Sequence, residues 1–316
     1  MARFLVTGGG GFIGSNIVEA LVSQDHFVRV LDNFSTGRTE NLAAVERSVE
    51  VIEGDIRSLL TVERAVKDVD FVLHQAALPS VPRSIADPGT TNEVNVSGTL
   101  NVLNAAREAG IRRVVIASSS SVYGSAPGLP KREDMIPSPL SPYAVSKFTS
   151  ELYARVFQGL YGLEVVVLRY FNVFGKHQNP DSQYSAVIPK FCKALLHNVS
   201  PTIFGDGGQS RDFTHVENVV SANILACTTA SAAGTVINVA SGSRHTVNEL
   251  FDKLKDVMGA SVKPTYLPER KGEVRDSYAD ISLAKQVLGY TIRTDLDRGL
   301  ELTADYFRQY YSPEST

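Results

Sequence analysis

The sequence predicts an α/β fold: a doubly wound parallel sheet that carries a smaller α/β lobe. Three observations predict it. Short apolar segments alternate with helical ones in the first half, the apolar segments are continuous, and a glycine-rich turn joins the first strand to the first helix. Continuous apolar strands alternating with helices are typical of a parallel sheet covered on both faces. The expected strands are Arg3–Thr7, Phe27–Leu31, Val49–Glu53, Phe71–His74, Arg113–Ala117 and Leu163–Arg169.

The glycine-rich turn lies between the first strand and a segment with helical spacing that begins at Ile13. Its glycines fit two fingerprints, Gly9-x-Gly11-x-x-Gly14 and Gly8-x-x-Gly11-x-x-Gly14. Without Cβ atoms they permit a tight turn and let a pyrophosphate approach the backbone, where the helix N-terminus offers free N–H groups. The turn therefore favours a Rossmann-type dinucleotide site, although an ordinary strand-to-helix turn would have a similar sequence.

Asp32 strengthens this interpretation, because it ends the second strand at the interval that the fingerprint expects. A carboxylate there accepts hydrogen bonds from the adenosine ribose and repels a 2′-phosphate. The position favours NAD over NADP, and Arg38 nearby leaves NADP open.

Composition bounds the remaining possibilities. The 316 residues are 43% hydrophobic and 21% charged, with a formal charge of -3 and a pI near 6.1. No apolar run is long enough to cross a bilayer, no signal peptide is recognisable, and no basic stripe suggests nucleic acid. Cys192 and Cys227 lack CxxC spacing and the histidines lack ligand spacing, so we expect buried thiols, no catalytic metal and a cytoplasmic location.

The second half of the chain is less regular, with frequent prolines and glycines after about residue 175. Val236–Ala240 still has the pattern of a buried strand, so the chain is expected to return to the main sheet. We predict a dinucleotide-binding domain at residues 1–175, to which 212–245 return. Residues 176–211 and 246–316 would mainly form the smaller lobe.

Polar and small residues follow the third and fourth strands, where ligands of such sheets bind. Asp55 and the backbone of Ile56 would lie near an adenine, although Asp55 also fits an ordinary turn. Gln75-Ala76-Ala77 would let a flat cofactor lie close to the sheet, whereas His74 fits a structural role better. Asn95, in an expected helix at Asn92–Ala109, would have a supporting role.

Two segments carry reactive groups. Ser118–Gly124 closes the fifth strand, and a helix follows with Ser141 as N-cap and Pro142 as its first residue. Tyr143 and Lys147 stand four residues apart and so share one helix face. A nearby ammonium would lower the pKa of the tyrosine toward that of a general base. The alternative is a purely structural pair, in which Lys147 extends over a packed Tyr143.

Together these stretches, from Thr7 to about Tyr290, resemble the extended short-chain dehydrogenases/reductases of the nucleotide-sugar epimerase type. The resemblance implies that Tyr143 is the base and that Ser119, four residues before Tyr123, assists it. It also implies NAD as cofactor and a homodimer formed through a four-helix bundle. The cofactor-binding residues it implies are Gly8, Gly11, Phe12, Ile13, Gly14, Asp32, Asn33, Ser35, Thr36, Gly37, Asp55, Ile56, Gln75, Ala76, Ala77, Asn95, Ser118, Tyr143, Lys147 and Tyr170.

The serine cluster separates reaction types within this family. Related 4,6-dehydratases carry an Asp-Glu pair where Ser120-Ser121 stand, and UDP-glucuronate decarboxylases commonly carry Glu at the position of Ser121. A site with hydroxyls only lacks the acid or base for elimination, so simple epimerisation is the implied reaction.

The resemblance also implies where a UDP-sugar binds. Asn172 and Arg211 would hold the diphosphate, Arg270 and Glu273 would form a second clamp, and the family often has Asp where Glu273 stands. The full set of expected substrate-binding residues is Ser80, Ser119, Ser120, Tyr143, Asn172, Ala186, Val187, Lys190, Arg211, Arg270, Glu273 and Ser277.

Ser277 bears on substrate size, because it aligns with a family position that helps set the volume of the sugar pocket. A bulky Tyr there accompanies restriction to UDP-glucose and UDP-galactose, and smaller residues accompany acceptance of 2-acetamido sugars. With the stretches at Ser80–Ser84 and Phe174–Gln178, the chain looks most like bacterial UDP-N-acetylglucosamine 4-epimerases. Ser277 as an ordinary loop serine remains the alternative.

The implied reaction is C4 epimerisation of a UDP-hexose, UDP-GlcNAc/UDP-GalNAc first and UDP-Glc/UDP-Gal second. Hydride would pass to NAD, a 4-keto sugar would turn, and hydride would return. Three alternatives remain: a UDP-glucuronate or UDP-pentose 4-epimerase, a net oxidoreductase that releases NADH, and an inactive NAD-binding interaction protein.

Overall fold

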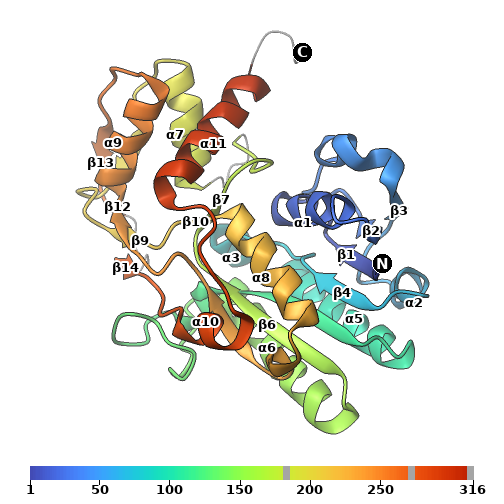
Figure 1. Ribbon diagram of the computed structural model, residues 1–316. Coiled ribbons are helices and arrows are strands. Elements are labelled where there is room, and N and C mark those ends of the chain that lie inside the picture. Colours follow the sequence, from blue (N-terminus) through green and yellow to red (C-terminus); the bar gives the residue numbers. More distant parts are fainter. Residues whose placement is uncertain (181–185, 270–274, 312–316) are drawn as a thin grey trace.

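The computed structural model describes residues 1–180, 186–269 and 275–311. Its centre is a seven-stranded sheet in the order β11-β6-β5-β4-β1-β2-β3, with every neighbouring pair parallel (Figure 1). The strands are β1 (Arg3–Thr7), β2 (Phe27–Asp32), β3 (Val49–Glu53), β4 (Phe71–His74), β5 (Arg113–Ser119), β6 (Glu164–Tyr170) and β11 (Val236–Val239). The predicted doubly wound sheet is confirmed, and residues 236–239 return to it.

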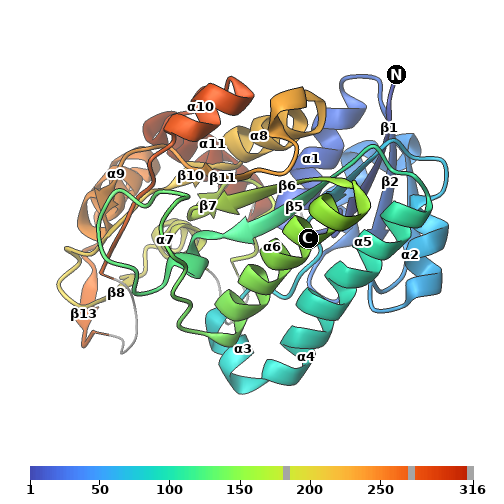
Figure 2. The same ribbon diagram turned by 90° about the horizontal axis from the view of Figure 1, so that it is seen from below.

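Helices cover both faces of this sheet, as the apolar strands require (Figure 2). Alternate strand side chains pack on α2 (Leu59–Val66), α5 (Gly98–Glu108) and α6 (Pro142–Tyr161) on one face. The other face packs on α1 (Phe12–Val22), α8 (Val216–Thr228) and α10 (Ser282–Leu288). A 3₁₀ segment at Thr39–Ser48 lies against α1.

Sequence signals explain where α6 begins and ends. The Ser141 side chain accepts a hydrogen bond from the Ala144 amide at 3.2 Å, Pro142 is the first helical residue, and Gly162 ends the helix with a φ of +70°. The predicted cap is confirmed. It fixes the start of the helix that carries Tyr143 and Lys147.

The helix expected at Asn92–Ala109 differs from the prediction. After the short helix α3 (Val81–Ala86), α4 (Pro88–Asn92) begins earlier, because the Asp87 side chain accepts from the Thr90 amide and caps it. A π-helical turn at Glu93–Ser97 then separates α4 from α5. Such turns occur frequently at functional sites, and this one contains Asn95.

The smaller lobe has its own core, built from α7 (Val187–Leu196), α9 (Val247–Met258) and α11 (Leu296–Tyr310). Its strands are short: β8 (Thr202–Phe204) pairs with β13 (Thr265–Leu267), and β9 (Ser210–Arg211) lies between β12 (His245–Thr246) and β14 (Asp276–Ser277). β7 (Val173–Phe174), separated from β6 by two residues, pairs with β10 (Thr214–His215). Residues 246–316 were predicted to belong mainly to the smaller lobe, but their helix α10 packs on the large sheet. The predicted domain boundaries remain predictions.

Candidate active site

The glycine-rich turn forms a tight cradle between β1 and α1. Gly8 has a φ of +70°, and a Cβ there would lie 2.7 Å from the backbone of Ala76. A Cβ on Gly14 would lie 2.1 Å from the Gly8 carbonyl oxygen, and one on Gly11 would lie 3.1 Å from the same atom. No side chain of the described residues caps the N-terminus of α1. The amides at Phe12 and Ile13 therefore begin a helix whose positive end suits a pyrophosphate.

Asp32, at the carboxyl end of β2, is fixed against this turn. Its carboxylate accepts from the Gly10 amide and the Phe34 amide, each at 2.8 Å. Burial raises the pKa of Asp32, and these hydrogen bonds oppose the rise. Each carboxylate oxygen retains a second lone pair for a ribose hydroxyl. The Arg38 guanidinium donates a hydrogen bond at 2.6 Å to the hydroxyl of Tyr310 on α11, so Arg38 already contacts another part of the protein. This arrangement fits NAD.

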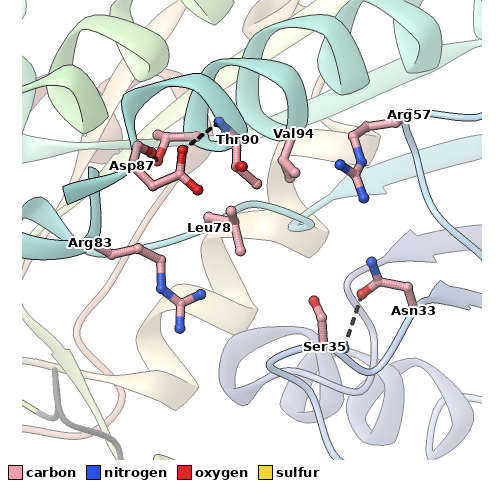
Figure 3. A pocket seen from close by; sticks show the side chains of 9 residues that line it. Asn33, Ser35, Arg57, Leu78, Arg83, Asp87, Thr90 and Val94 are labelled. Carbon is pink, nitrogen blue, oxygen red and sulfur yellow. Dashed lines mark hydrogen bonds between the residues drawn. The ribbon is translucent and has the colours of Figure 1, made fainter. Parts of the chain in front are cut away.

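A cavity of about 330 Å³ opens beside this carboxyl edge (Figure 3). Asn33 and Ser35 come from the loop after β2, and Arg57, Leu78 and Arg83 from the segments after β3 and β4. Thr36 is exposed in the same loop, and a Cβ on Gly37 would press on the Gly10 backbone at 2.8 Å. Of the expected cofactor residues, Asn33 and Ser35 thus line this cavity.

Asp55 is less available than the sequence suggested. Arg57 donates to both of its oxygens, Asn33 donates to Oδ2 at 2.9 Å, and the bond from Arg57 lowers its pKa to about 2. The Ile56 carbonyl accepts from Asn101 at 3.0 Å, and the Ile56 side chain is buried. Asp55 therefore orders the rim of the cavity through Arg57 and Asn33.

The end of β4 is held by a network of neutral groups. His74 bonds Thr7 Oγ1 at 2.7 Å and Thr99 Oγ1 at 2.9 Å, and burial lowers its pKa to about 3, as a structural histidine requires. Gln75 bonds both Tyr170, at 3.1 Å, and Asn223, at 3.0 Å. These bonds fix the backbone at Ala76 and Ala77 beside Gly8.

Asn95 supports the same segment from the π-helical turn. Its Oδ1 accepts from the Leu78 amide at 2.8 Å, and its Nδ2 donates to the Leu78 carbonyl and to Ser146 Oγ at 3.0 Å. Asn95 therefore ties the chain beyond β4 to α6, and in this structure its side chain holds protein groups.

The three expected catalytic residues meet where β5 ends on α6. Tyr143 lies near enough to Ser119 for that hydroxyl to lower its pKa, and Lys147 Nζ donates to the Ala117 carbonyl at 2.8 Å. The expectation of a lowered pKa for Tyr143 is wrong for this structure: burial raises it, and the influence of the Ser119 hydroxyl only partly opposes that effect. Burial also lowers the pKa of Lys147 to about 8. Desolvation is thus the largest influence on the pKa of Tyr143 and on that of Lys147.

Two functional candidates escaped the sequence analysis, Glu151 and Arg169. Ser118 donates to Glu151 at 2.5 Å, and Arg169 makes a buried ion pair with Glu151 at 2.7 Å. The available signals were Glu151 four residues after Lys147 and an arginine inside an apolar strand. The expected role of Ser118 on a cofactor is not visible here, because its hydroxyl is directed to Glu151.

Apart from Ser119 and Tyr143, the expected substrate residues fall into four groups. Ser120 opens a 3₁₀ turn at Ser120–Tyr123, and Ser80 caps α3 by accepting from the Arg83 amide at 3.1 Å. Ala186, Val187 and Lys190 lie at the start of α7, with Lys190 exposed. Arg270 and Glu273 lie outside the described residues.

Asn172, Arg211 and Ser277 lie along the junction between the large sheet and the smaller lobe. Asn172, two residues beyond β6, has a φ of +28° and donates to the Asp212 carbonyl at 3.2 Å. Arg211 on β9 is in register with Ser277 on β14, and Arg211 Nη1 donates to the Arg275 carbonyl at 2.7 Å. The Asp212 amide donates to the Ser277 carbonyl at 2.9 Å. One strand pair thus joins the expected diphosphate and sugar-pocket positions.

Other site types find no support in the described part of the chain. There, no group of three His, Cys, Asp or Glu side chains is placed to hold a metal, and no helix is both long and apolar enough to cross a membrane. Cys192 and Cys227 are free and buried, as predicted, and burial raises the pKa of each to about 12.

Comparison with known proteins places this chain in a family. Residues 4–240 match the NAD dependent epimerase/dehydratase family. The structure of UDP-N-acetylglucosamine 4-epimerase from Methanobrevibacter ruminantium M1, in complex with UDP-N-acetylmuramic acid, is 42% identical. That match has a TM-score of 0.93 and covers 98% of each chain.

Two further relatives carry different substrate names. The putative UDP-glucose 4-epimerase of Methanocaldococcus jannaschii is 39% identical over 96% of this chain and 98% of its own. A UDP-glucuronic acid 4-epimerase structure from Bacillus cereus, with NAD, is 32% identical with a TM-score of 0.91, over 98% and 100% of the chains. From its glycine cradle to its Ser-Tyr-Lys set, this chain belongs to the NAD-dependent epimerase/dehydratase family, as an NAD-dependent UDP-sugar 4-epimerase.

Proposed function

We propose that this protein interconverts UDP-GlcNAc and UDP-GalNAc, and that it also accepts the UDP-Glc/UDP-Gal pair. The observation that carries the proposal is Ser277, a small residue whose strand is in register with Arg211. A short hydroxyl side chain leaves volume at the position where tyrosine restricts the family to sugars without an acetamido group. The 42% identity to a UDP-N-acetylglucosamine 4-epimerase supports the same choice.

The residues at the junction of β5 and α6 would perform the proton transfer. Bound NAD supplies a reversible hydride acceptor, which the glycine cradle and Asp32 would hold. Tyr143 would accept the proton of the C4 hydroxyl and later return it, while Ser119 hydrogen-bonds the reacting oxygen. The positive charge of Lys147 would support the Tyr143 phenolate, which burial otherwise disfavours.

The 3₁₀ turn after β5 favours epimerisation over elimination. It presents Ser120 and Ser121, and the buried Ser121 hydroxyl has no partner among the described residues. Neither residue is a carboxylic acid that could protonate a leaving hydroxyl. A 4-keto sugar formed here would therefore be reduced again at C4.

Ser277→Tyr tests the substrate preference. The larger side chain is expected to lower kcat/KM for UDP-GlcNAc by about a hundredfold while changing that for UDP-Glc about threefold or less, because it fills the volume needed by the acetamido group. Ser277→Ala is the matched control, and both substrates should behave as in the wild type. Equal losses on both substrates in Ser277→Tyr would mean that Ser277 does not face the 2-substituent.

We further propose a homodimer through the bundle formed by α6 and the Asn92–Ala109 segment. Val145, Leu152 and Val156 are 50%, 44% and 44% exposed and form one apolar stripe along α6. Exposed Ile85 on α3, which packs against α6, adds to that surface. A second copy of the chain would bury it in an isologous interface.

Charge placed on this stripe is expected to separate the subunits. Leu152→Glu with Val156→Glu should halve the sedimenting mass, because each carboxylate would be desolvated at the interface. Leu60→Glu on α2, where Leu60 is 79% exposed, is the control and should leave the mass unchanged. A wild-type chain that sediments as a monomer would contradict the proposal.

A further inference from the structure

Helix α6 carries a third charged residue at the spacing that joins Tyr143 to Lys147. Tyr143, Lys147 and Glu151 stand four residues apart in turn, so their side chains lie along one face of the helix. That face packs on β5 and β6. The charged groups of Lys147 and Glu151 are both buried there, at 7% and 5% residue exposure.

Glu151 binds two strands at once. Its Oε1 accepts from Ser118 Oγ on β5 at 2.5 Å and from Arg169 Nε on β6 at 3.0 Å, and its Oε2 accepts from Arg169 Nη2 at 2.7 Å. Ser118 directly precedes Ser119, and Lys147 is anchored one turn earlier at the Ala117 carbonyl. The helix and the strand end that hold the reacting groups are therefore joined at consecutive turns.

A buried ion pair of this kind contributes little net stability compared with a well-packed apolar pair, although breaking it is costly. The pair is nevertheless almost entirely excluded from solvent: the Glu151 and Arg169 side chains are each 4% exposed. Arg169 also lies over the ring of Tyr123 at 4.7 Å, which links the pair to the turn after Ser119. The location and the charge of the Glu151–Arg169 pair thus explain its presence better than a contribution to stability does.

We propose that Glu151 is a positioning residue for the epimerase reaction. The Glu151 carboxylate bonds both Ser118 and Arg169, and it thereby fixes the position of α6 against β5. This keeps Tyr143 and Lys147 on α6 close to Ser119 on β5. The inference rests on the proposed function for its kinetic consequences, whereas its structural consequences are independent of the substrate.

The charges around Lys147 add an electrostatic consequence. Among the described residues, Glu151 and His74 interact electrostatically with Lys147, and Arg169 pairs with Glu151 from β6. Tyr143 lies one turn before Lys147 on α6. The π-helical turn and α5 contribute the neutral Asn95, which bonds Ser146, and Thr99, which bonds His74. His74 is neutral at physiological pH, because its pKa is about 3. Glu151 raises the pKa of Lys147 against the larger effect of burial. Removing its charge should make Lys147 lose its proton at lower pH.

Glu151→Gln tests the proposal, because it keeps the shape and removes the charge. We expect kcat to fall about 10- to 100-fold, a part of what proton transfer contributes. The alkaline limb of the kcat–pH profile should move about one unit toward lower pH, since Lys147 would become neutral earlier. Glu164→Gln is the matched control: it breaks the Arg113–Glu164 pair of the same two strands at their opposite ends, and it should leave both kcat and the profile unchanged.

A second variant separates positioning from stability. Glu151→Leu with Arg169→Met replaces the ion pair by apolar side chains and should recover the thermal stability that Glu151→Gln loses. It should not recover kcat, because the link to Ser118 is gone. Recovery of both stability and kcat would show a purely structural role and overturn the proposal.

A substrate-free readout keeps this test distinct from that of the proposed function. Nitrogen-15 NMR of the lysine Nζ groups, with Lys147→Met used for assignment, follows the ionisation of Lys147 alone. The pKa of Lys147 should be lower in Glu151→Gln than in the wild type, because the carboxylate that favours the ammonium is gone. An unchanged Lys147 pKa and an unchanged kcat–pH profile would overturn the inference. A wild-type protein inactive on every UDP-sugar would instead overturn the proposed function. The titration alone would then test the positioning role of Glu151.

Discussion

Tyr143→Phe is expected to lower turnover of the UDP-sugar by about a thousandfold or more, because it removes the group that we propose takes the C4 hydroxyl proton. The ring remains, so the packing of α6 against β5 should change little, and only the phenol oxygen near Ser119 is lost. The protein should fold as the wild type does and should retain NAD. The measurement is kcat together with the nucleotide released when the purified protein is denatured.

Tyr153→Phe is the matched control, because Tyr153 is a half-buried tyrosine on the same helix. It should leave kcat within about twofold of the wild type. If Tyr143→Phe kept wild-type turnover, Tyr143 would not be the base and the mechanism would need another proton acceptor. If it lost NAD as well as activity, its role would lie in forming the cofactor site.

Gly14→Ala is expected to abolish cofactor binding. The added Cβ would lie 2.1 Å from the Gly8 carbonyl oxygen, a rigid backbone atom. The turn would have to move away from α1, at a cost of about 3 kcal/mol or more, which lowers affinity for NAD more than about a hundredfold. The measurement is the NAD content of the purified protein, followed by titration with added NAD.

Gly159→Ala provides a control of the same chemical change in another helix. Gly159 lies within α6, and a Cβ there meets no atom within 4 Å. That variant should keep its NAD and be slightly more stable, since alanine favours the helix. A Gly14→Ala protein that bound NAD normally would show that the pyrophosphate does not use this turn.

The sequence was most informative where the determinants are local. Gly8, Gly14 and Asp32 lie within one strand-turn-helix unit and the next strand, so their spacing alone predicted the cradle that the structure contains. The start of α6 was predictable for the same reason, because Ser141 and Pro142 act on adjacent backbone groups. The parallel sheet followed from continuous apolar strands such as Val165–Leu168.

The network beneath the proposed catalytic residues was not predictable, because it depends on contacts between distant segments. Glu151 stood at a visible spacing from Lys147, but its partners Ser118 and Arg169 come from two different strands. The pKa of Tyr143 was missed for a related reason: the helical spacing places Lys147 nearby, whereas the degree of burial depends on the whole fold. The strands of the smaller lobe are only two or three residues long, too short for periodicity to mark them.

The most direct test of the account is proton NMR of the purified protein with UDP-GlcNAc and, separately, with UDP-Glc, without added NAD. We predict signals of the C4 epimer from UDP-GlcNAc and slower conversion of UDP-Glc, because NAD is expected to remain bound and Ser277 is proposed to leave room for the acetamido group. Conversion of UDP-Glc alone would retain the mechanism and reject the assignment of the substrate. Absence of epimer from both, with conversion of UDP-glucuronate or a UDP-pentose instead, would contradict the proposed function.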